Sequence, residues 1–169
     1  MDSQGPMQEP KHGYRNQLRE QVVREATSGS PAESLPTESL LRGRILLVED
    51  SEDVCRLFTI FLESEGATVE CVSNGELAVQ RLLSARMPRV DLVLMDMQMP
   101  VMDGYDATRR LRSAGCRLPI VALTAHALAG DRAKCLASGC DEYLPKPVER
   151  KTLIAKCKSV MCQPHAAAA

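Results

Sequence analysis

Residues 91–107 read DLVLMDMQMPVMDGYDA and contain the pattern that decides the fold. The apolar run at residues 92–95 ends at Asp96, and Gly104 follows after a short loop. An apolar run without alternation is typical of a parallel strand that helices cover on both faces. Gly104 suits a turn into a helix, because glycine tolerates backbone geometry that other residues avoid. This stretch therefore predicts a buried strand, a loop and the start of a helix.

The same pattern recurs on both sides of this stretch. Apolar runs at residues 45–48 and 120–123 predict two further buried strands, whereas residues 67–72 and 141–144 predict edge strands. Five β-α units in succession predict an α/β fold: a doubly wound, five-stranded parallel sheet in the flavodoxin-like order 2-1-3-4-5, with five helices in a three-layer sandwich. Apolar side chains at helical spacing mark three of the helix faces: Val54, Leu57, Phe58, Phe61 and Leu62; Val79, Leu82 and Leu83; Leu153, Ile154, Cys157, Val160 and Met161.

Short signals predict where several helices begin and end. Ser73 and Glu76 have the spacing of a capping box, which would open the second helix. Gly66, Gly115 and Gly139 each follow a helical segment, where a left-handed cap is expected.

The chain divides into a domain and two tails. Its 169 residues fit one domain with an extension. Residues 1–43 hold four of the ten prolines and few apolar side chains, which predicts a flexible N-terminal tail or linker. Residues 44–162 contain the β-α pattern, and residues 163–169 are predicted to be a C-terminal tail.

Composition argues against several functions. Lysine plus arginine total 21 against 22 acidic residues, the net charge is −1, and aromatic residues make up 3% of the chain. Direct nucleic-acid binding is not expected, because it needs basic or aromatic surfaces. No apolar run is long enough to span a membrane, and the N-terminus has no apolar export signal. We therefore expect a cytoplasmic protein without a membrane partner.

The seven cysteines are odd in number and form no CxxC pair. In a chain without an export signal, this argues against a disulfide framework and against a zinc site. We predict that most of them are small buried side chains, with Cys55 and Cys71 in the core.

Polar residues follow four of the five predicted strands. Glu49 and Asp50 follow the first strand, Asp96 the third, Thr124 the fourth and Lys146 the fifth. Because the carboxyl ends of parallel strands meet at one edge of a sheet, these side chains are expected to converge there. Clustered carboxylates suit Mg²⁺, which prefers oxygen ligands, and an ammonium with a hydroxyl suits a phosphoryl group.

Four stretches extend this pattern: ILLVEDSEDV at residues 45–54, DLVLMDMQMPVMDGYDA at 91–107, PIVALTAHA at 119–127 and DEYLPKPV at 141–148. With these motifs, residues 44–162 closely resemble the receiver (response-regulator) domain of two-component signalling, the fold of the bacterial chemotaxis response regulator. The stretches ALTAHA and MDMQMPVMDG are most similar to receivers attached to hybrid sensor histidine kinases.

The resemblance implies a role for each matching residue. It places Asp96 at the phospho-accepting aspartate and Lys146 at the family's lysine, whose bond to Pro147 corresponds to one that is often cis. It places Thr124 at the switch hydroxyl and Tyr143 at the aromatic switch position. It further implies that Mg²⁺ is held by Glu49, Asp50, Asp96 and the backbone carbonyl of Gln98, and that Gln98 and His126 tune hydrolysis.

The implied function is phosphoryl acceptance in a phosphorelay. A sensor histidine kinase or a histidine phosphotransfer protein would supply the phosphoryl group, and residues 126–161 would change conformation toward an effector that the sequence does not identify. The sequence leaves open a phosphorylation-dependent dimer through that surface. No glycine-rich nucleotide loop is present, so we expect a signalling domain with slow autodephosphorylation rather than a kinase or another enzyme. No DNA-binding output domain is expected after residue 162.

Two alternatives remain at this point. One is a scaffold receiver that acts without phosphorylation, although all five site residues are intact. The other is a Mg²⁺-dependent phosphatase of the haloacid-dehalogenase type, whose aspartate nucleophile follows the first strand and has a second aspartate two residues on. Here the position two residues after Asp96 is Gln98.

Overall fold

The computed structural model describes residues 40–84, 88–125 and 129–162, and strands alternate with helices along them. The strands are β1 (Gly43–Val48), β2 (Ala67–Val72), β3 (Leu92–Asp96), β4 (Ile120–Thr124) and β5 (Glu142–Pro145). The helices are α2 (Glu52–Glu63), α3 (Gly75–Leu83), α4 (Gly104–Ser113), α5 (Ala129–Ala137) and α6 (Arg150–Met161).

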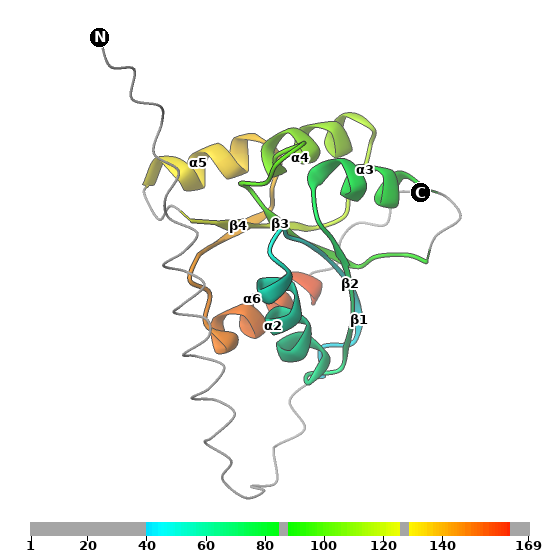
Figure 1. Ribbon diagram of the computed structural model, residues 1–169, viewed down its shortest axis with the longest axis vertical. Coiled ribbons are helices and arrows are strands. Elements are labelled where there is room, and N and C mark those ends of the chain that lie inside the picture. The colour runs from blue at the N-terminus through cyan, green and yellow to red at the C-terminus, as the bar shows by residue number, and fades with distance from the viewer. Residues whose placement is uncertain (1–39, 85–87, 126–128, 163–169) are drawn as a thin grey trace, which may run out of the picture. The chain divides into compact units, whose positions relative to one another are not determined.

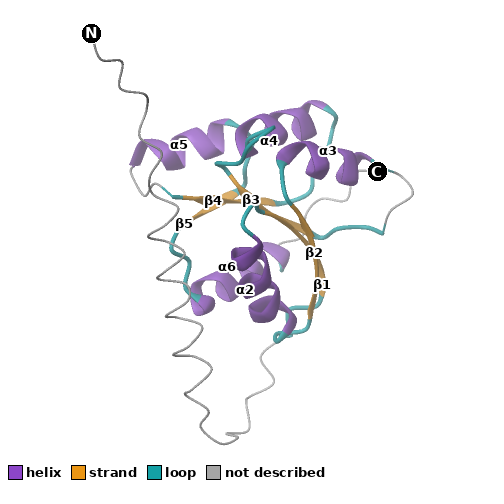
Figure 2. Cartoon of the chain, viewed as in Figure 1, coloured by secondary structure: helices purple, strands orange, loops and turns teal. Residues whose placement is uncertain are grey.

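The five strands form one parallel sheet in the order β2-β1-β3-β4-β5. Helices α3, α4 and α5 cover one face of the sheet, and α2 and α6 cover the other (Figure 1). Figure 2 shows the strands as the middle layer between these two groups of helices. The predicted doubly wound, three-layer α/β fold is therefore confirmed, and β2 and β5 are its edge strands as expected.

The core lies on both sides of the three central strands. Every residue of β3 and β4 is buried, as an uninterrupted apolar run predicts. On the α2 side, the helix buries the five side chains that its spacing predicts: Val54, Leu57, Phe58, Phe61 and Leu62. Each buried side chain of this size contributes about 1.5–3 kcal/mol relative to an exposed one, so this face holds α2 against the sheet.

Helix α3 begins one residue later than the capping-box prediction implies, and that prediction is wrong. The cap is Asn74, whose side-chain oxygen accepts a hydrogen bond of 2.9 Å from the Leu77 backbone N–H. The predicted apolar face is confirmed in part. Val79 and Leu82 are partly buried against the core, but Leu83 is 48% exposed and Arg81 is only 8% exposed. Gly75 and Ala78 are the other two buried residues of this helix.

An ion pair explains why Arg81 is buried. Its guanidinium donates to both carboxylate oxygens of Glu70 on β2, at 2.5 and 2.7 Å, and to the Pro88 carbonyl at 2.9 Å. A two-pronged pair of this kind matches the planar geometry of both groups. It joins α3 to the edge strand and keeps the buried charge compensated.

A second arginine joins the loops at the amino ends of β4 and β5. Arg112 on α4 donates to the carbonyls of Cys116, Leu118 and Gly139 at 2.8–2.9 Å and to the Asp141 carboxylate at 2.8 Å. The Asp141 carboxylate also accepts from the Ile120 backbone N–H at 2.7 Å. We call this group of contacts the Arg112 clasp.

Four glycines occupy positions where a side chain would be strained or would clash. Gly66, Gly115 and Gly139 have positive φ values of 96°, 81° and 104° after their helices, which confirms the predicted left-handed caps. Gly104 opens α4 for a different reason. A Cβ atom there would meet the Asp96 carbonyl oxygen and lie 2.9 Å from the Met97 Cα.

We expect Gly104→Ala to destabilise the protein by about 2 kcal/mol or more, because the added methyl group pushes against backbone that has no room to move. Gly130→Ala is the matched control, since a Cβ atom at this helical position meets nothing within 4 Å. That control should leave stability unchanged or raise it by up to about 1 kcal/mol. Urea unfolding of both variants measures the difference, and equal effects would contradict the packing argument.

The cysteines are less buried than predicted. Cys135, Cys140 and Cys157 are buried, Cys55 and Cys116 are partly buried, and Cys71 and Cys162 are exposed. The placement of Cys71 in the core is therefore wrong, because edge strand β2 ends beside an open pocket that this residue lines. All seven are free thiols.

Within the described ranges, none of the helices is both long and apolar enough to cross a lipid bilayer.

Candidate functional site

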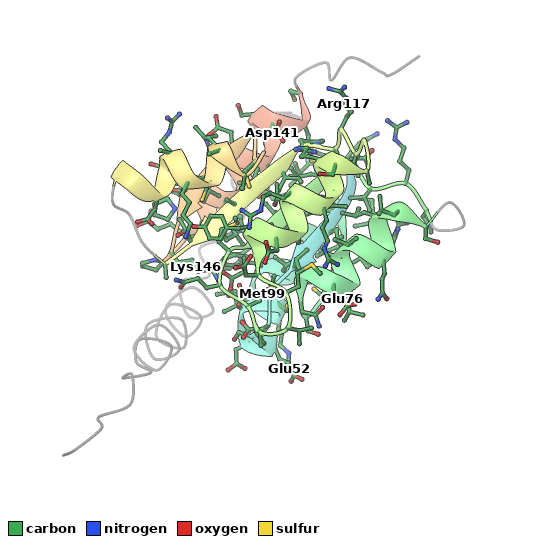
Figure 3. All side chains as sticks on the ribbon, turned by 90° about the horizontal axis from the view of Figure 1, so that it is seen from above. Glu52, Glu76, Met99, Arg117, Asp141 and Lys146 are labelled. Carbon is green, nitrogen blue, oxygen red and sulfur yellow. The ribbon has the colours of Figure 1, made fainter. Side chains whose placement is uncertain are left out.

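The polar residues predicted to converge do so at the carboxyl ends of the strands. Glu49 and Asp50 directly follow β1, Asp96 and Thr124 end β3 and β4, and Lys146 directly follows β5. Figure 3 shows Lys146 and Met99 toward one end of the domain, with Asp141 and Arg117 toward the other. The site and the Arg112 clasp thus lie at opposite ends of the sheet.

Lys146 joins two of the carboxylates. Its ammonium donates to Glu49 Oε2 at 2.5 Å and to Asp96 Oδ2 at 2.9 Å. The two carboxylate residues are only 3% and 4% exposed. Burial alone would lower the pKa of Lys146, but the attraction of Asp96 and Glu49 outweighs it and holds this pKa above its ordinary value. Lys146 is therefore a fixed positive charge at the centre of the site.

Asp50 completes a cluster of three carboxylates. One ligand oxygen of Glu49, Asp50 and Asp96 each lies within 4.8 Å of the others. Three carboxylates facing one ammonium leave an excess of negative charge, and oxygen donors in this number suit a hard divalent cation such as Mg²⁺. The donor set therefore fits a Mg²⁺ ion.

The titration of Glu49 reflects this crowding. Burial, which disfavours a charged carboxylate, raises its pKa to about 7; attraction by Lys146 opposes the rise and repulsion by Asp96 adds to it. A carboxyl whose pKa is raised on folding stabilises the fold fully below its unfolded value of 4.5. That contribution disappears as the pH rises through about 7.

We therefore expect the Mg²⁺-free protein to lose stability between about pH 5 and pH 8, and Glu49→Gln to remove most of that loss. The glutamine keeps the shape of the side chain but has no charge to bury. Glu76→Gln on the exposed side of α3 is the control. Thermal unfolding with EDTA across this range tests the expectation, and a Glu49→Gln profile as steep as that of the unmodified protein would contradict it.

Backbone contacts hold Asp96 in place. The Gln98 N–H donates to Asp96 Oδ1 at 3.0 Å, and the Met97 N–H donates to the Leu123 carbonyl on β4 at 3.0 Å. Met97, Met99 and Met102 are buried, so they pack this loop against the core. Gln98 itself is exposed.

The residues with predicted switch roles lie on β4 and β5. Thr124 is 2% exposed, and its carbonyl accepts from the Lys146 N–H at 2.6 Å. The Lys146–Pro147 bond is cis, as the resemblance implies. Tyr143 is half-buried, with the Arg132 guanidinium 5.8 Å from its ring centre. His126 lies outside the described residues.

Two further residues contact Glu49 that the sequence argument did not assign to the site. The Ser51 N–H donates to Glu49 Oε1 at 3.3 Å, and Cys55 Sγ donates to the Glu49 carbonyl at 3.5 Å. The hydroxyl oxygen of Ser51 is buried without a hydrogen-bond partner among the described residues. Ser51 is the N-cap of α2 and Cys55 lies in its first turn, so their closeness in sequence to the acidic pair was the available signal.

Comparison with known proteins gives a consistent result. Residues 45–158 match the family described as response regulator receiver domain. Histidine kinase 1 of Arabidopsis thaliana is 40% identical over 161 residues, which cover 75% of this chain and 13% of that protein. Two-component response regulator ORR41 of Oryza sativa subsp. japonica is 44% identical over 112 residues, covering 65% of this chain and 87% of that protein. The chain thus spans a small part of one relative and most of the other.

A solved structure agrees with both. The receiver domain of sensor histidine kinase PA1611 from Pseudomonas aeruginosa PAO1 is 42% identical, with a TM-score of 0.64 and coverage of 72% of this chain and 98% of that one. That crystal structure is described as having a magnesium ion coordinated in the active site cleft.

Proposed function

This chain belongs to the response regulator receiver domain family of two-component signalling, and from that premise we propose that it accepts a phosphoryl group on Asp96 from a phosphohistidine of a partner protein. The observation that carries the proposal is the position of Asp96. Its carboxylate is buried at the end of β3, 2.9 Å from the Lys146 ammonium and within 4.8 Å of the Glu49 and Asp50 oxygens.

The transfer is a displacement at phosphorus. A carboxylate oxygen of Asp96 forms a bond to the phosphorus while the bond from phosphorus to the histidine nitrogen breaks. The imidazole leaves with the electron pair and takes up a proton. Lys146 is already hydrogen-bonded to Asp96, so its charge is in place to neutralise the phosphoryl oxygens without reorganisation. The site therefore contributes positioning and electrostatic stabilisation.

The same geometry supports a metal-binding role for the acidic residues. Glu49, Asp50, Asp96 and the backbone carbonyl of Gln98 would hold Mg²⁺, whose charge stabilises the oxygens of the transferred group. The magnesium ion of the PA1611 receiver supports this assignment by similarity. Glu49, whose pKa is about 7 while the cluster lacks a cation, would become ionised when the ion binds.

Phosphorylation then alters the surface of α5, β5 and α6. Thr124 supplies a hydroxyl at the end of β4 that can donate to a phosphoryl oxygen, and Tyr143 can move inward as that hydroxyl moves. The phosphoryl group shifts the populations of two states that exist beforehand. Gln98 and His126 are proposed to set the lifetime of the phosphorylated form, and the altered surface is proposed to bind an effector or a second copy of the chain.

The relatives indicate the class of partner. A receiver that resembles those of histidine kinases receives its phosphoryl group from a histidine kinase or a histidine phosphotransfer protein. We further propose a cytoplasmic location and residues 163–169 as a C-terminal tail. Residues 1–43 are proposed to be a linker or tail except at their end, where Leu41 is buried and Gly43 begins β1. The haloacid-dehalogenase alternative is less well supported, because residues 45–158 match the receiver family. A nucleophile of that type would also follow β1 and have a second aspartate two residues on, whereas Gln98 stands two residues after Asp96.

The test is intact-mass spectrometry after incubation with acetyl phosphate and Mg²⁺. We expect the mass of one phosphoryl group to be added, and EDTA or Asp50→Asn to lower the initial rate by at least about tenfold. Glu52→Gln is the matched control, since this exposed side chain belongs to the first turn of α2. No adduct with acetyl phosphate or with a panel of phosphorylated histidine phosphotransfer proteins would favour the phosphorylation-independent scaffold.

A further inference from the structure

Two thiols face each other beside the acidic cluster, across the contact between α2 and β2. Cys55 and Thr59 lie at i and i+4 on one side of α2, and Cys71 lies near the end of β2, the strand that α2 contacts. Thr59 Oγ1 is 3.5 Å from Cys71 Sγ, and the thiols of Cys55 and Cys71 lie close enough for each to influence the pKa of the other. Both cysteines line one open pocket together with Asp50 and Arg56.

We propose that Cys71 and Cys55 are a redox modification site, at which a hydroperoxide oxidises Cys71 and Cys55 then closes a disulfide. Neither residue has a part in the phosphoryl transfer described above, so the inference is independent of it. Cys71 is the initial nucleophile because it is exposed, whereas Cys55 is partly buried.

The chemistry of Cys71 supports this order of events. Hydrogen bonds from Cys55 and Thr59 lower its pKa to about 6, against the opposing effect of burial. A thiolate is the form of cysteine that attacks peroxides. Cys162 is also exposed, and it is the C-cap residue of α6. Among the described residues, no contact joins it to another thiol.

The two steps balance as follows. The Cys71 thiolate sulfur attacks one peroxide oxygen, the O–O bond breaks, and the leaving hydroxide or alkoxide takes a proton, which leaves a sulfenic acid on Cys71. The Cys55 sulfur then attacks the Cys71 sulfur, the S–O bond breaks, and the hydroxide leaves with the Cys55 proton as water. Two thiols are oxidised to one disulfide while the hydroperoxide is reduced to water and an alcohol, or to two waters when it is hydrogen peroxide.

The disulfide would also change a contact of the acidic loop. Cys55 Sγ now donates to the Glu49 carbonyl at 3.5 Å, and a sulfur in a disulfide has no proton to donate. Oxidation would therefore remove a hydrogen bond that links α2 to the residue after β1.

The experiment treats the full chain with hydrogen peroxide and follows intact mass, alkylation of free thiols and peptide mapping. We expect a loss of two hydrogen atoms, a crosslink between the peptides that contain Cys55 and Cys71, and full reversal by dithiothreitol. Peroxide should oxidise Cys71 at least about tenfold faster than Cys162, measured as the rate at which each thiol stops reacting with the alkylating reagent. A crosslink between other cysteines, or oxidation of Cys71 no faster than that of Cys162, would overturn the proposal.

Variants separate the two steps. Cys55→Ser should stop at the sulfenic acid on Cys71, which a cyclic 1,3-diketone such as dimedone captures. Cys71→Ser should prevent both the disulfide and the captured adduct, whereas the control Cys162→Ser should change neither. A disulfide-linked dimer in place of the intramolecular crosslink would show that the two thiols do not pair within one chain and would also overturn the proposal.

Discussion

Replacing Asp96 by asparagine is expected to abolish phosphoryl acceptance, with no adduct detectable under conditions that modify the unmodified chain completely. The amide keeps the size of the side chain and can still accept from the Gln98 N–H, which now bonds to Asp96 Oδ1 at 3.0 Å. It has no anionic oxygen to attack phosphorus, so the chemical step is lost while the local packing is kept. Intact mass after treatment with acetyl phosphate and Mg²⁺ is the measurement.

Asp106→Asn is the matched control for this experiment. Asp106 is an exposed aspartate in the first turn of α4 and pairs only with the nearby Arg109 among the contacts described. The same chemical change there should leave the rate of phosphorylation unaltered. An adduct of equal size on Asp96→Asn would mean that another residue is the acceptor.

Replacing Lys146 by methionine is expected to cost about 3–5 kcal/mol of stability at pH 8, the range found when one partner of a buried ion pair is removed. Methionine has a similar length but no charge, so the buried carboxylates of Glu49 and Asp96 lose their counter-ion. Below about pH 5 the loss should shrink, because protonation removes the unpaired negative charge. The rate of phosphorylation should fall as well, since the charge that neutralises the phosphoryl oxygens is gone.

A surface ion pair provides the control. Lys156 donates to Glu142 at 3.1 Å, but the two side chains are 30% and 38% exposed. Lys156→Met should therefore cost no more than about 1 kcal/mol and show little pH dependence. Urea unfolding of both variants at pH 5 and pH 8, with EDTA present, measures the contrast. Equal losses for the two lysines would refute a special role for the buried pair.

The elements that sequence patterns predicted well are those with large apolar side chains. Helix α2 was predicted from five such residues, and all five are buried. Helix α3 was predicted less well because its buried residues include Gly75 and Ala78, and small side chains give a weak signal. Burial of Arg81 could not be foreseen either, since its partner Glu70 lies on the preceding strand and only the fold brings the two together.

For the candidate site, the sequence predicted where the residues lie but not which hydrogen bonds they form. A parallel sheet gathers whatever follows its strands, so the convergence of Glu49, Asp96 and Lys146 followed from the order of the elements. The bonds from Lys146 to both carboxylates span 97 and 50 residues along the chain, and no local pattern encodes them. Cys55 was assigned to the core because cysteine is small and often buried. In the structure its thiol donates to the Glu49 carbonyl, beside the site.

The Arg112 clasp has a consequence for how the protein tolerates change. It holds the amino ends of β4 and β5, whereas the phosphoryl chemistry is assigned to the carboxyl ends. No contact described here is shared by the two groups of residues. Free-energy effects of substitutions in such separate groups add with little coupling. Substitutions in the Arg112 clasp could therefore change the melting temperature without changing the rate of phosphorylation. Substitutions in the site could in turn change that rate without adding to the effects of substitutions in the clasp beyond their own cost in stability.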